Sequence, residues 1–364
     1  MDATTVAEDE RVLTSDLEYH LPDHLVATTP AARRDRARLL VVERSGTLDH
    51  RHVEDLPDLV TSGDTFVFNS TRVLRARFLG SREDTGGSVE GLYLHPGPDV
   101  DTWVCMLRMR RFRAGATIRL LDRDDGPTDV VLTLVESTPE GWVVRVEGDA
   151  MSILDRVGRV PLPPYIRSRR KVVGLDVPDD EDHDRYQTVF ARASGSVAAP
   201  TAGLHFTPDL LGRLDRAGVR RLECTLHVGT GTFRPIETER VEDHPMHTEW
   251  CAMDEATSDA MRNAIGDGPA LTCVGTTSAR TVETYAALDS WRPHVDTDLL
   301  ITPGYAWRAT RGLLTNFHLP RSTLLAMVGA LLPGGLAQLL EIYAEAISHE
   351  YRFYSYGDAM LIRP

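Results

Sequence analysis

Apolar and polar residues alternate along much of the segment from residue 73 to residue 148. Short alternating runs occupy residues 88–94, 103–107, 130–134 and 142–146, and turns rich in Gly, Pro and Asp separate them. Alternation with a period of two, interrupted by turn residues, is typical of antiparallel β-structure. About six such strands suit a small closed barrel. We therefore expect residues 73–148 to form a β-barrel domain that is inserted into the chain.

Outside this segment, stretches with helical periodicity alternate with short apolar runs that predict buried strands. We expect strands at residues 39–42, 65–68, 221–228, 270–274 and 360–362, and helices at residues 151–157, 208–217, 254–265, 278–288, 321–332 and 336–347. This alternation is typical of a layered α/β domain. The predicted fold class is therefore α/β: a layered α/β catalytic domain, discontinuous over residues 1–72 and 149–364, interrupted by the small β-barrel domain.

The composition excludes several classes of protein. A chain of 364 residues with 42% hydrophobic content can build globular cores. No apolar run reaches the roughly 18 residues that a membrane span needs. The four cysteines lie far apart with no C-x-x-C pair, which argues against a disulfide framework or a zinc site. We expect a cytoplasmic protein that is a monomer and does not bind a membrane.

The net charge of −14 argues against a general polyanion-binding protein but leaves room for a local basic face. Basic residues are concentrated in two places, at Arg108, Arg110, Arg111 and Arg113 around Phe112, and at Arg167, Arg169, Arg170 and Lys171. The first group is either a phosphate-contact patch with a stacking aromatic or a solvated strand and turn. We expect residues 167–184, which also hold an acidic run, to form a mobile loop whose opposed charges can pair.

Residues 195–206 form a run of small side chains that ends in a histidine and an aromatic residue. Thr207 and Pro208 follow, and they have the residue types of a helix N-cap and a first helical position. Gly, Ala, Ser and Thr let the backbone come close to a ligand, and a helix start favours negative charge. The alternative is a tightly packed turn.

Residues 226–233 repeat this pattern, because His227 is followed by Gly229, Thr230 and Gly231. One helix and one strand are expected between the two runs. Two such loops can face each other across a cleft at the strand ends of an α/β sheet, where these folds bind ligands.

His205 and His227 each end an apolar segment beside one of these loops. Histidine suits proton transfer because its unperturbed pKa lies near neutrality. A lone histidine is nevertheless more often a packed or hydrogen-bonded core residue. Both interpretations therefore stay open for His205 and His227.

Two further groups of residues can bind or position a ligand. Thr276, Thr277 and Ser278 lie between an expected strand and an expected helix, where hydroxyl and N–H groups gather at a positive helix end. Arg280 follows in the first turn. Asp358 follows an aromatic cluster at residues 351–356 and can accept a hydrogen bond from a base or an amine, although a packed terminal strand has the same composition.

Several segments together resemble the S-adenosylmethionine:tRNA ribosyltransferase-isomerase family of queuosine biosynthesis. The resemblance extends in order over nearly the whole chain, through residues 68–73, 161–166, 186–190, 195–206, 226–233, 243–249, 274–278, 314–320 and 351–360. The family fold that this implies is an α/β domain interrupted by a β-barrel. The implied enzyme is a transferase and isomerase that modifies tRNA.

The resemblance implies an unusual use of S-adenosylmethionine as co-substrate. Its ribosyl part is transferred to 7-aminomethyl-7-deazaguanine in the anticodon loop of tRNA and isomerised, which gives epoxyqueuosine, adenine and methionine. The catalytic candidates are His205, His227 and Asp358, and the candidates for binding S-adenosylmethionine are Gly229, Thr230, Gly231, Thr276, Thr277, Ser278 and Arg280. The family needs no metal, although Asp243, His244, His247 and Glu249 can also be interpreted as metal ligands.

Two alternatives to the tRNA-modifying enzyme stay open. A paralogue with the same fold could use S-adenosylmethionine as ribosyl donor to a small-molecule acceptor. A binding protein could keep the cleft and lack turnover, but the matching segments disfavour that hypothesis.

Overall fold

The computed structural model describes residues 11–229, 236–265 and 271–363. It divides into two compact units. The first, which we call the α/β unit, consists of Met1–Thr71, Thr188–Ala193 and Ala199–Pro364, and the second, the barrel unit, consists of Arg72–Gln187 and Ser194–Ala198. A mixed α/β fold with an inserted closed barrel confirms the expected fold class. The barrel unit also includes helices that lie beyond the expected insert at residues 73–148.

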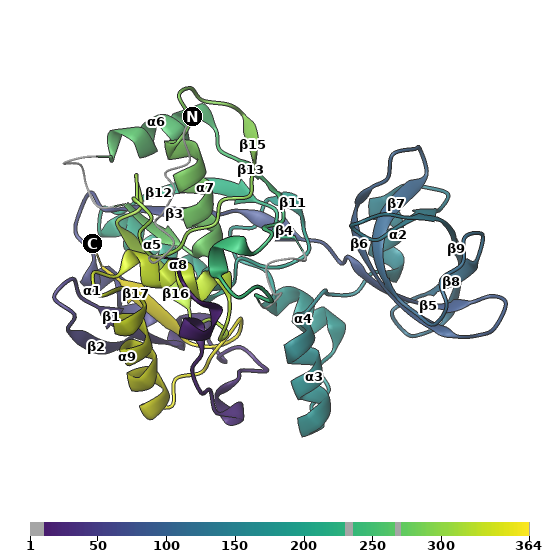
Figure 1. Cartoon of the computed structure of the whole chain (residues 1–364), viewed down its shortest axis with the longest axis horizontal. Helices are drawn as coiled ribbons and strands as arrows, with labels where there is room; N and C mark the ends of the chain where they lie inside the picture. The colour runs from purple at the N-terminus through teal and green to yellow at the C-terminus, as the bar shows by residue number, and fades with distance from the viewer. Residues whose placement is uncertain (1–10, 230–235, 266–270, 364) are drawn as a thin grey trace. The chain divides into compact units, whose positions relative to one another are not determined.

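A nine-stranded sheet forms the centre of the α/β unit, in the order β15-β13-β12-β3-β14-β16-β17-β1-β2 (Figure 1). The strands are β1 Arg38–Val42, β2 Leu48–His52, β3 Thr65–Asn69, β12 Arg220–Leu226, β13 Glu249–Ala252, β14 Leu271–Val274, β15 His294–Thr297, β16 Gly312–Asn316 and β17 Ala359–Ile362. Strands β12, β3, β14 and β16 are parallel, whereas β17 is antiparallel to β16. The carboxyl ends of four strands and the amino end of β17 therefore meet at one edge.

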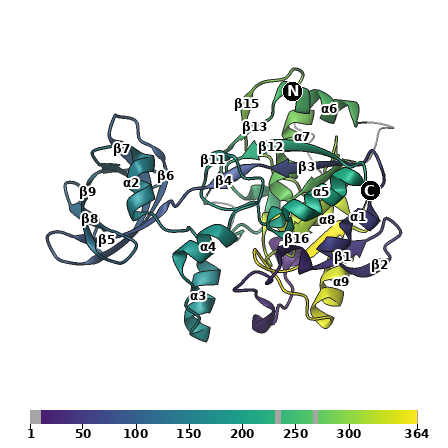
Figure 2. The same cartoon turned by 180° about the vertical axis from the view of Figure 1, so that it is seen from behind.

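Helices cover both faces of this sheet (Figures 1 and 2). They are α1 Leu56–Leu59, α5 Pro208–Arg216, α6 Glu255–Asn263, α7 Thr276–Ala286, α8 Thr323–Leu331 and α9 Gly335–Ser348. Side chains alternate along a strand, so Phe66 and Phe68 of β3 point to one face and pack with Leu210 of α5. Asn69 points to the other face and bonds Thr277 of α7. All the helices expected between residues 208 and 347 are present.

The expected N-terminal signal of α5 is confirmed. Thr207 is the N-cap, its side chain accepts a hydrogen bond from the Leu210 backbone N–H at 3.1 Å, and Pro208 is the first helical residue. The cap satisfies one of the backbone donors that a helix start leaves unpaired.

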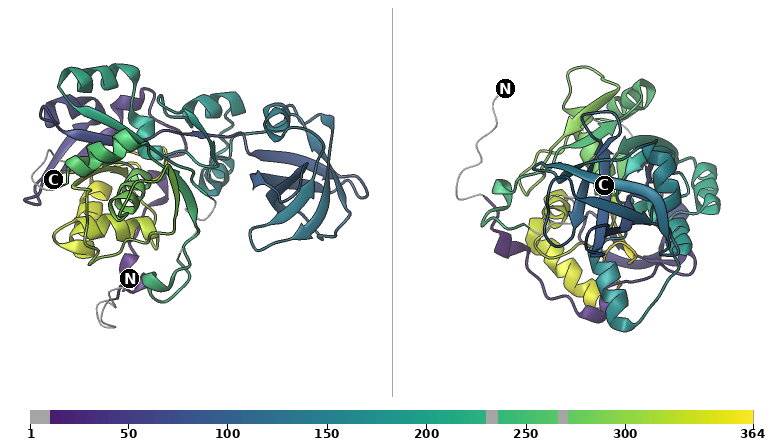
Figure 3. Two further views of the ribbon diagram at one scale, coloured as in Figure 1. Left: turned by 90° about the horizontal axis from the view of Figure 1, so that it is seen from above. Right: turned by 90° about the vertical axis from the view of Figure 1, so that its right-hand side faces the viewer.

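The barrel unit contains a closed barrel (Figure 3). Its strand order is β10-β7-β6-β5-β8-β9. Its strands are β5 Arg77–Arg82, β6 Ser88–Pro96, β7 Thr102–Arg108, β8 Thr117–Leu121, β9 Pro127–Ser137 and β10 Trp142–Arg145. Phe78, Tyr93 and Trp103 fill the interior with edge-to-face ring contacts. Gly91 faces this cluster, and a Cβ atom there would lie 2.1 Å from the Phe78 ring. Strands β4 Thr71–Val73 and β11 Ala193–Ser196 form a separate pair.

The expectation of a mobile loop at residues 167–184 is wrong. After helix α2 Ala150–Val157, this part of the chain forms helix α3 Pro164–Val173 and helix α4 Asp179–Arg185. The opposed charges explain why this segment is structured, because Arg170 of α3 and Asp182 of α4 form a buried ion pair. Its two hydrogen bonds have N–O distances of 2.5 and 2.8 Å. Arg170 is therefore not an accessible phosphate contact, and Arg167 pairs with Glu90.

Within the described residues, no single helix has both the length and the apolar character to cross a membrane. Helices α8 and α9, which are joined at a sharp bend, are together long and apolar enough to cross a membrane by length and composition alone.

Candidate functional site

The candidate site is the sheet edge at which β12, β3, β14 and β16 end. The chain places His227 just after β12, Asn69 at the end of β3, Thr276 after β14, Asn316 at the end of β16 and Asp358 just before β17. Neighbouring strands lie roughly 4.8 Å apart, so β12 and β16, three spacings apart, are separated by roughly 14 Å. Residues from distant parts of the sequence thus form one row of polar groups.

His227 lies at one end of this row and is half-buried. Its Nδ1 atom lies 2.8 Å from the Thr71 hydroxyl, and its ring stacks on Trp250 with centroids 4.8 Å apart. Desolvation lowers the pKa of His227 below its usual value. The ring is therefore neutral at neutral pH, and no described residue forms a hydrogen bond to its Nε2 atom.

Asn69 joins three elements beside His227. Its Nδ2 atom donates to the Leu226 carbonyl at 3.0 Å and to the Thr277 hydroxyl at 3.1 Å, and its Oδ1 atom accepts from the Leu226 backbone N–H. The side chain is buried and ties β3 to β12 and α7. An asparagine at a strand end can serve a ligand or can pair with a neighbouring loop, and here the Asn69 amide bonds protein groups of β12 and α7.

Helix α7 begins directly at this edge. Gly275 precedes it with a φ of +89°, a conformation that glycine adopts without strain. Thr276, Thr277 and Ser278 are all buried, and the Ser278 hydroxyl donates to the Val274 carbonyl at 2.8 Å. The Ser278 hydroxyl is therefore committed to the helix start, while Thr277 accepts from Asn69.

Arg280, one turn further along α7, forms a buried ion pair with Glu249 of β13. Glu249 also accepts a hydrogen bond from the Gly229 backbone N–H at 2.9 Å, so it links α7 to the chain that follows His227. This pair lies in the wall of a pocket, open to solvent, that is lined by His244, Met246, His247, Glu249, Arg280, Leu299, Leu300, Ile301, Thr323, Leu324 and Met327.

His205 lies at the other end of the row, in a short 3₁₀ helix, Thr201–His205. It is buried, and its Nε2 atom lies 3.2 Å from Asn316 Nδ2. The Asn316 amide nitrogen also faces the Asp358 carbonyl, while its oxygen accepts from the Thr201 hydroxyl at 2.9 Å. His205 Nε2 is therefore a hydrogen-bond acceptor, and desolvation lowers the pKa of His205 to about 4.

Asp358 is buried and fully engaged with the protein. Its carboxylate accepts hydrogen bonds from the backbone N–H groups of Arg38 and Arg352 at 3.0 and 2.8 Å. The Arg38 guanidinium adds bonds at 3.2 and 3.1 Å. These contacts anchor β1 and the chain before β17 at this edge.

The expected arrangement of two loops is described only in part. Thr230 and Gly231 lie outside the described residues, so of the second loop the structure places His227 and Gly229. In the first loop, a Cβ atom at Gly203 would lie 2.8 Å from the Phe190 ring, so the chain there is closely packed. The structure brings His227, Gly229, Thr277 and Arg280 together through Asn69 and Glu249, whereas His205 and Asp358 meet at Asn316.

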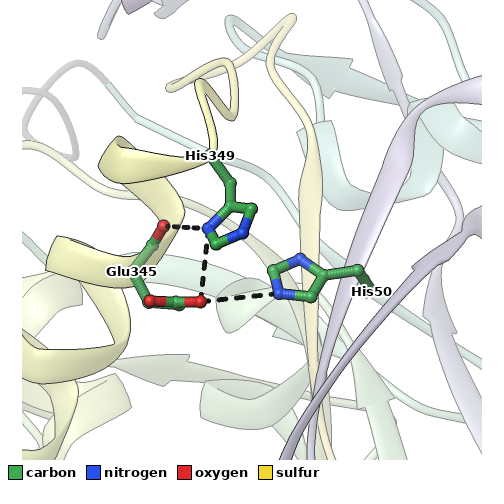
Figure 4. Close-up of side chains that lie close together, drawn as sticks. All are labelled: His50, Glu345 and His349. Atoms are coloured by element: carbon green, nitrogen blue, oxygen red, sulfur yellow. Dashed lines mark hydrogen bonds and ion pairs between the residues drawn. The ribbon is translucent and has the colours of Figure 1, made fainter.

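A different group of side chains in the α/β unit has the spacing of metal ligands. His50, Glu345 and His349 place possible ligand atoms within 4.8 Å of one another (Figure 4). Glu345 lies 3.2 Å from His349 and 3.7 Å from His50, and the Tyr351 hydroxyl lies 2.9 Å from His50 Nδ1. Both histidines are exposed, so mutual hydrogen bonds and ion pairs in solvent explain this group.

The fold and this edge define an α/β protein with an inserted barrel and a candidate site at the carboxyl ends of parallel strands. The family described as queuosine biosynthesis protein matches residues 14–362. The chain belongs to this family, which confirms the resemblance noted in its sequence.

Named relatives match over nearly the full chain. The S-adenosylmethionine:tRNA ribosyltransferase-isomerase of Erythrobacter litoralis is 43% identical, with 95% of this chain and 97% of the relative covered. The protein of that name from Gloeobacter violaceus is 44% identical, with 98% and 97% covered. The crystal structure of S-adenosylmethionine tRNA ribosyltransferase from Thermotoga maritima is similar with a TM-score of 0.52 and 27% identity, covering 95% of this chain and 99% of that one.

Proposed function

We propose that this protein is an S-adenosylmethionine:tRNA ribosyltransferase-isomerase. It transfers the ribosyl part of S-adenosylmethionine to 7-aminomethyl-7-deazaguanine in tRNA and isomerises it, which gives epoxyqueuosine, adenine and methionine. The observation that carries this proposal is the match over nearly the full chain to relatives of that name at 43–44% identity.

The reaction needs a base that removes a proton from the ribosyl carbon that is bonded to the sulfonium. It also needs a donor that helps adenine leave. His227 suits the base, because it is half-buried and neutral and no described residue bonds its Nε2 atom. If the Thr71 hydroxyl donates to the Ala193 carbonyl, 3.4 Å away, its lone pair accepts from His227 Nδ1–H. Nε2 then carries the lone pair that accepts the proton.

His205 and Asp358 take a supporting place in this proposal. Both are buried, and their polar atoms are already bonded within the row. They would hold Asn316 and the β16–β17 edge in position, and Asn316 would be the group that faces the ligand. Gly229, Thr276, Thr277 and Arg280 would bind S-adenosylmethionine from the β12–α7 side, and Thr230, Gly231 and Ser278 stay predictions for the same role.

Further properties follow from this function. An enzyme that modifies tRNA works where tRNA is, which places it in the cytoplasm. We also propose that acid–base groups supply the chemistry and that the enzyme uses no metal and binds no membrane. The monomeric state and the division into domains at residues 72 and 149 stay predictions.

tRNA binding needs a local basic surface, since the chain as a whole is acidic. Arg108, Arg110, Arg111 and Arg113 are exposed in the barrel unit, and Phe112 stacks on Trp142 with centroids 5.4 Å apart. A plot of the logarithm of the tRNA-binding constant against the logarithm of the salt concentration has a negative slope. Each phosphate contact makes that slope steeper by roughly 0.7 to 0.9. Reversing two of these charges, as in R110E with R113E, should weaken tRNA binding and flatten its salt dependence, while S-adenosylmethionine binding is unchanged.

The function is tested by incubating the protein with S-adenosylmethionine and a purified tRNA that carries the aminomethyl-deazaguanine base. We expect stoichiometric release of adenine and methionine, and no release with the same tRNA carrying guanine. S-Adenosylhomocysteine as the main product would contradict the proposal. Release with the free base but not with the tRNA would favour the small-molecule acceptor.

A further inference from the structure

The pocket beside Glu249 and Arg280 combines two kinds of wall. One wall carries the buried ion pair of opposite charges. The other walls carry apolar side chains, among them Ile301, Leu324 and Met327, together with His244, His247 and Thr323. Small-molecule sites commonly have this composition, with a few polar groups that fix orientation on an apolar surface.

Arg280 has hydrogen-bonding capacity left for a ligand. A guanidinium carries five N–H donors. The partners of Arg280 are Glu249, the Leu299 carbonyl at 3.1 Å and the Thr297 carbonyl at 3.5 Å, and no other described residue bonds it. Two N–H groups therefore lack a described partner, and a carboxylate is the group that a guanidinium binds best.

The surroundings of Arg280 favour the same ligand group. Thr323 is the first residue of α8, whose N-cap is Ser322, so the positive end of this nine-residue helix borders the pocket. Glu249 supplies the opposite charge directly beside the guanidinium. The polar wall therefore presents a positive and a negative group next to each other, which complements the carboxylate and ammonium of an α-amino acid.

We infer that this pocket binds the methionine end of S-adenosylmethionine. The carboxylate contacts Arg280, the ammonium contacts Glu249, and the methylene groups between them and the sulfonium pack on Met246, Leu324 and Met327. Methionine side chains are adaptable and fill irregular apolar contacts. This inference rests on the proposed function, and it names the residues that hold one part of its co-substrate.

The pocket is connected to His227 through the backbone. Glu249 accepts a hydrogen bond from the Gly229 backbone N–H, two residues after His227. The next residue, Trp250, stacks on the His227 ring and projects to the opposite face of β13 from Glu249.

The test compares S-adenosylmethionine with decarboxylated S-adenosylmethionine, which lacks only the carboxylate. Isothermal titration of the wild-type protein should show that decarboxylation weakens binding about 10- to 100-fold, the range expected for hydrogen bonds to a charged group. In R280Q this difference should disappear. In R292Q, which alters an exposed arginine of the same unit, the difference should persist.

Equal binding of the two compounds by the wild-type protein would overturn the inference, even if R280Q fails to fold. A folded R280Q protein that still distinguishes them would also overturn it. The proposed function is judged separately by adenine release: if the wild-type protein releases adenine but does not distinguish the two compounds, only the inference about the pocket falls.

Discussion

The two ends of the row of strand termini contain the same kind of residue in opposite surroundings. At the β12 end, His227 is half-buried, stacks on an exposed tryptophan and has no described hydrogen-bond partner at Nε2. At the β16 end, His205 is buried and its Nε2 atom accepts from Asn316, which Thr201 and Asp358 hold in turn. A histidine that must exchange a proton with a ligand needs the first environment.

The separation of the two histidines has a consequence for the reaction. Three strand spacings, roughly 14 Å, lie between the ends of β12 and β16. Groups that lie at strand ends so far apart suit different parts of an extended co-substrate. We therefore propose that His227 transfers the proton and that His205 maintains a buried hydrogen-bond network.

The largest expected effect is on turnover at the β12 end. His227→Ala should lower kcat by about 10²-fold or more, since proton transfer by a positioned side chain contributes that much. Its thermal unfolding should stay close to that of the wild-type protein. His294→Ala is a matched control, because His294 is exposed and stacks on the same Trp250 at 6.0 Å. A folded His227→Ala protein with near-normal turnover would remove His227 from the mechanism.

The next effect is on stability at the β16 end. Asp358→Asn should lower the free energy of unfolding by about 2–3 kcal/mol, because it weakens buried charged hydrogen bonds to Arg38 and Arg352. Urea unfolding measures this loss. The exposed pair of Asp49 and Arg51 provides the control, and Asp49→Asn should cost about 1 kcal/mol or less. A fully stable Asp358→Asn protein without turnover would instead make Asp358 a catalytic residue.

The smallest effect, counted per pH unit, is a pH dependence of stability. The pKa of His205 is about 4 in the folded protein, and its usual value is 6.5. Between these values the unfolded chain binds a proton that the folded chain does not, so the free energy of unfolding decreases as the pH falls from 6.5 to 4. The contribution of His205 to this slope is at most about 1.4 kcal/mol per pH unit.

His205→Gln should reduce that slope, measured by urea unfolding at several pH values. His318 has a pKa lowered to about 4 by the same desolvation, so part of the slope should remain in the variant. An unchanged slope would show that His205 is not buried in its neutral form.

Much of the fold could be predicted because its signals are local. Alternation along residues 88–94 and the cap at Thr207 each depend on a few neighbouring residues, and both features are present in the structure. The segment at residues 167–184 could not be predicted, since its charges resemble a solvated loop. The burial of Arg170 becomes clear only when Asp182, twelve residues later, is placed against it.

The candidate site residues follow from the sequence as a set, but their arrangement does not. Glycine and threonine runs beside histidines predict positions at the strand ends of an α/β sheet, and the described ones lie at one edge of the sheet. The sequence could not distinguish His227 from His205, because the difference depends on Asn316, Thr71 and Trp250, which lie far away or on other strands. Glu249 and Arg280 are 31 residues apart, and only the sheet order brings them together.

The central claim is that His227 removes the proton from the carbon beside the sulfonium. It is tested most directly with S-adenosylmethionine that carries deuterium at that carbon, by following the appearance of deuterium in water during turnover with the tRNA. The wild-type protein should release deuterium, and His227→Ala should release it at least about 10²-fold more slowly while still binding S-adenosylmethionine. Release of deuterium at the wild-type rate by His227→Ala would contradict the account.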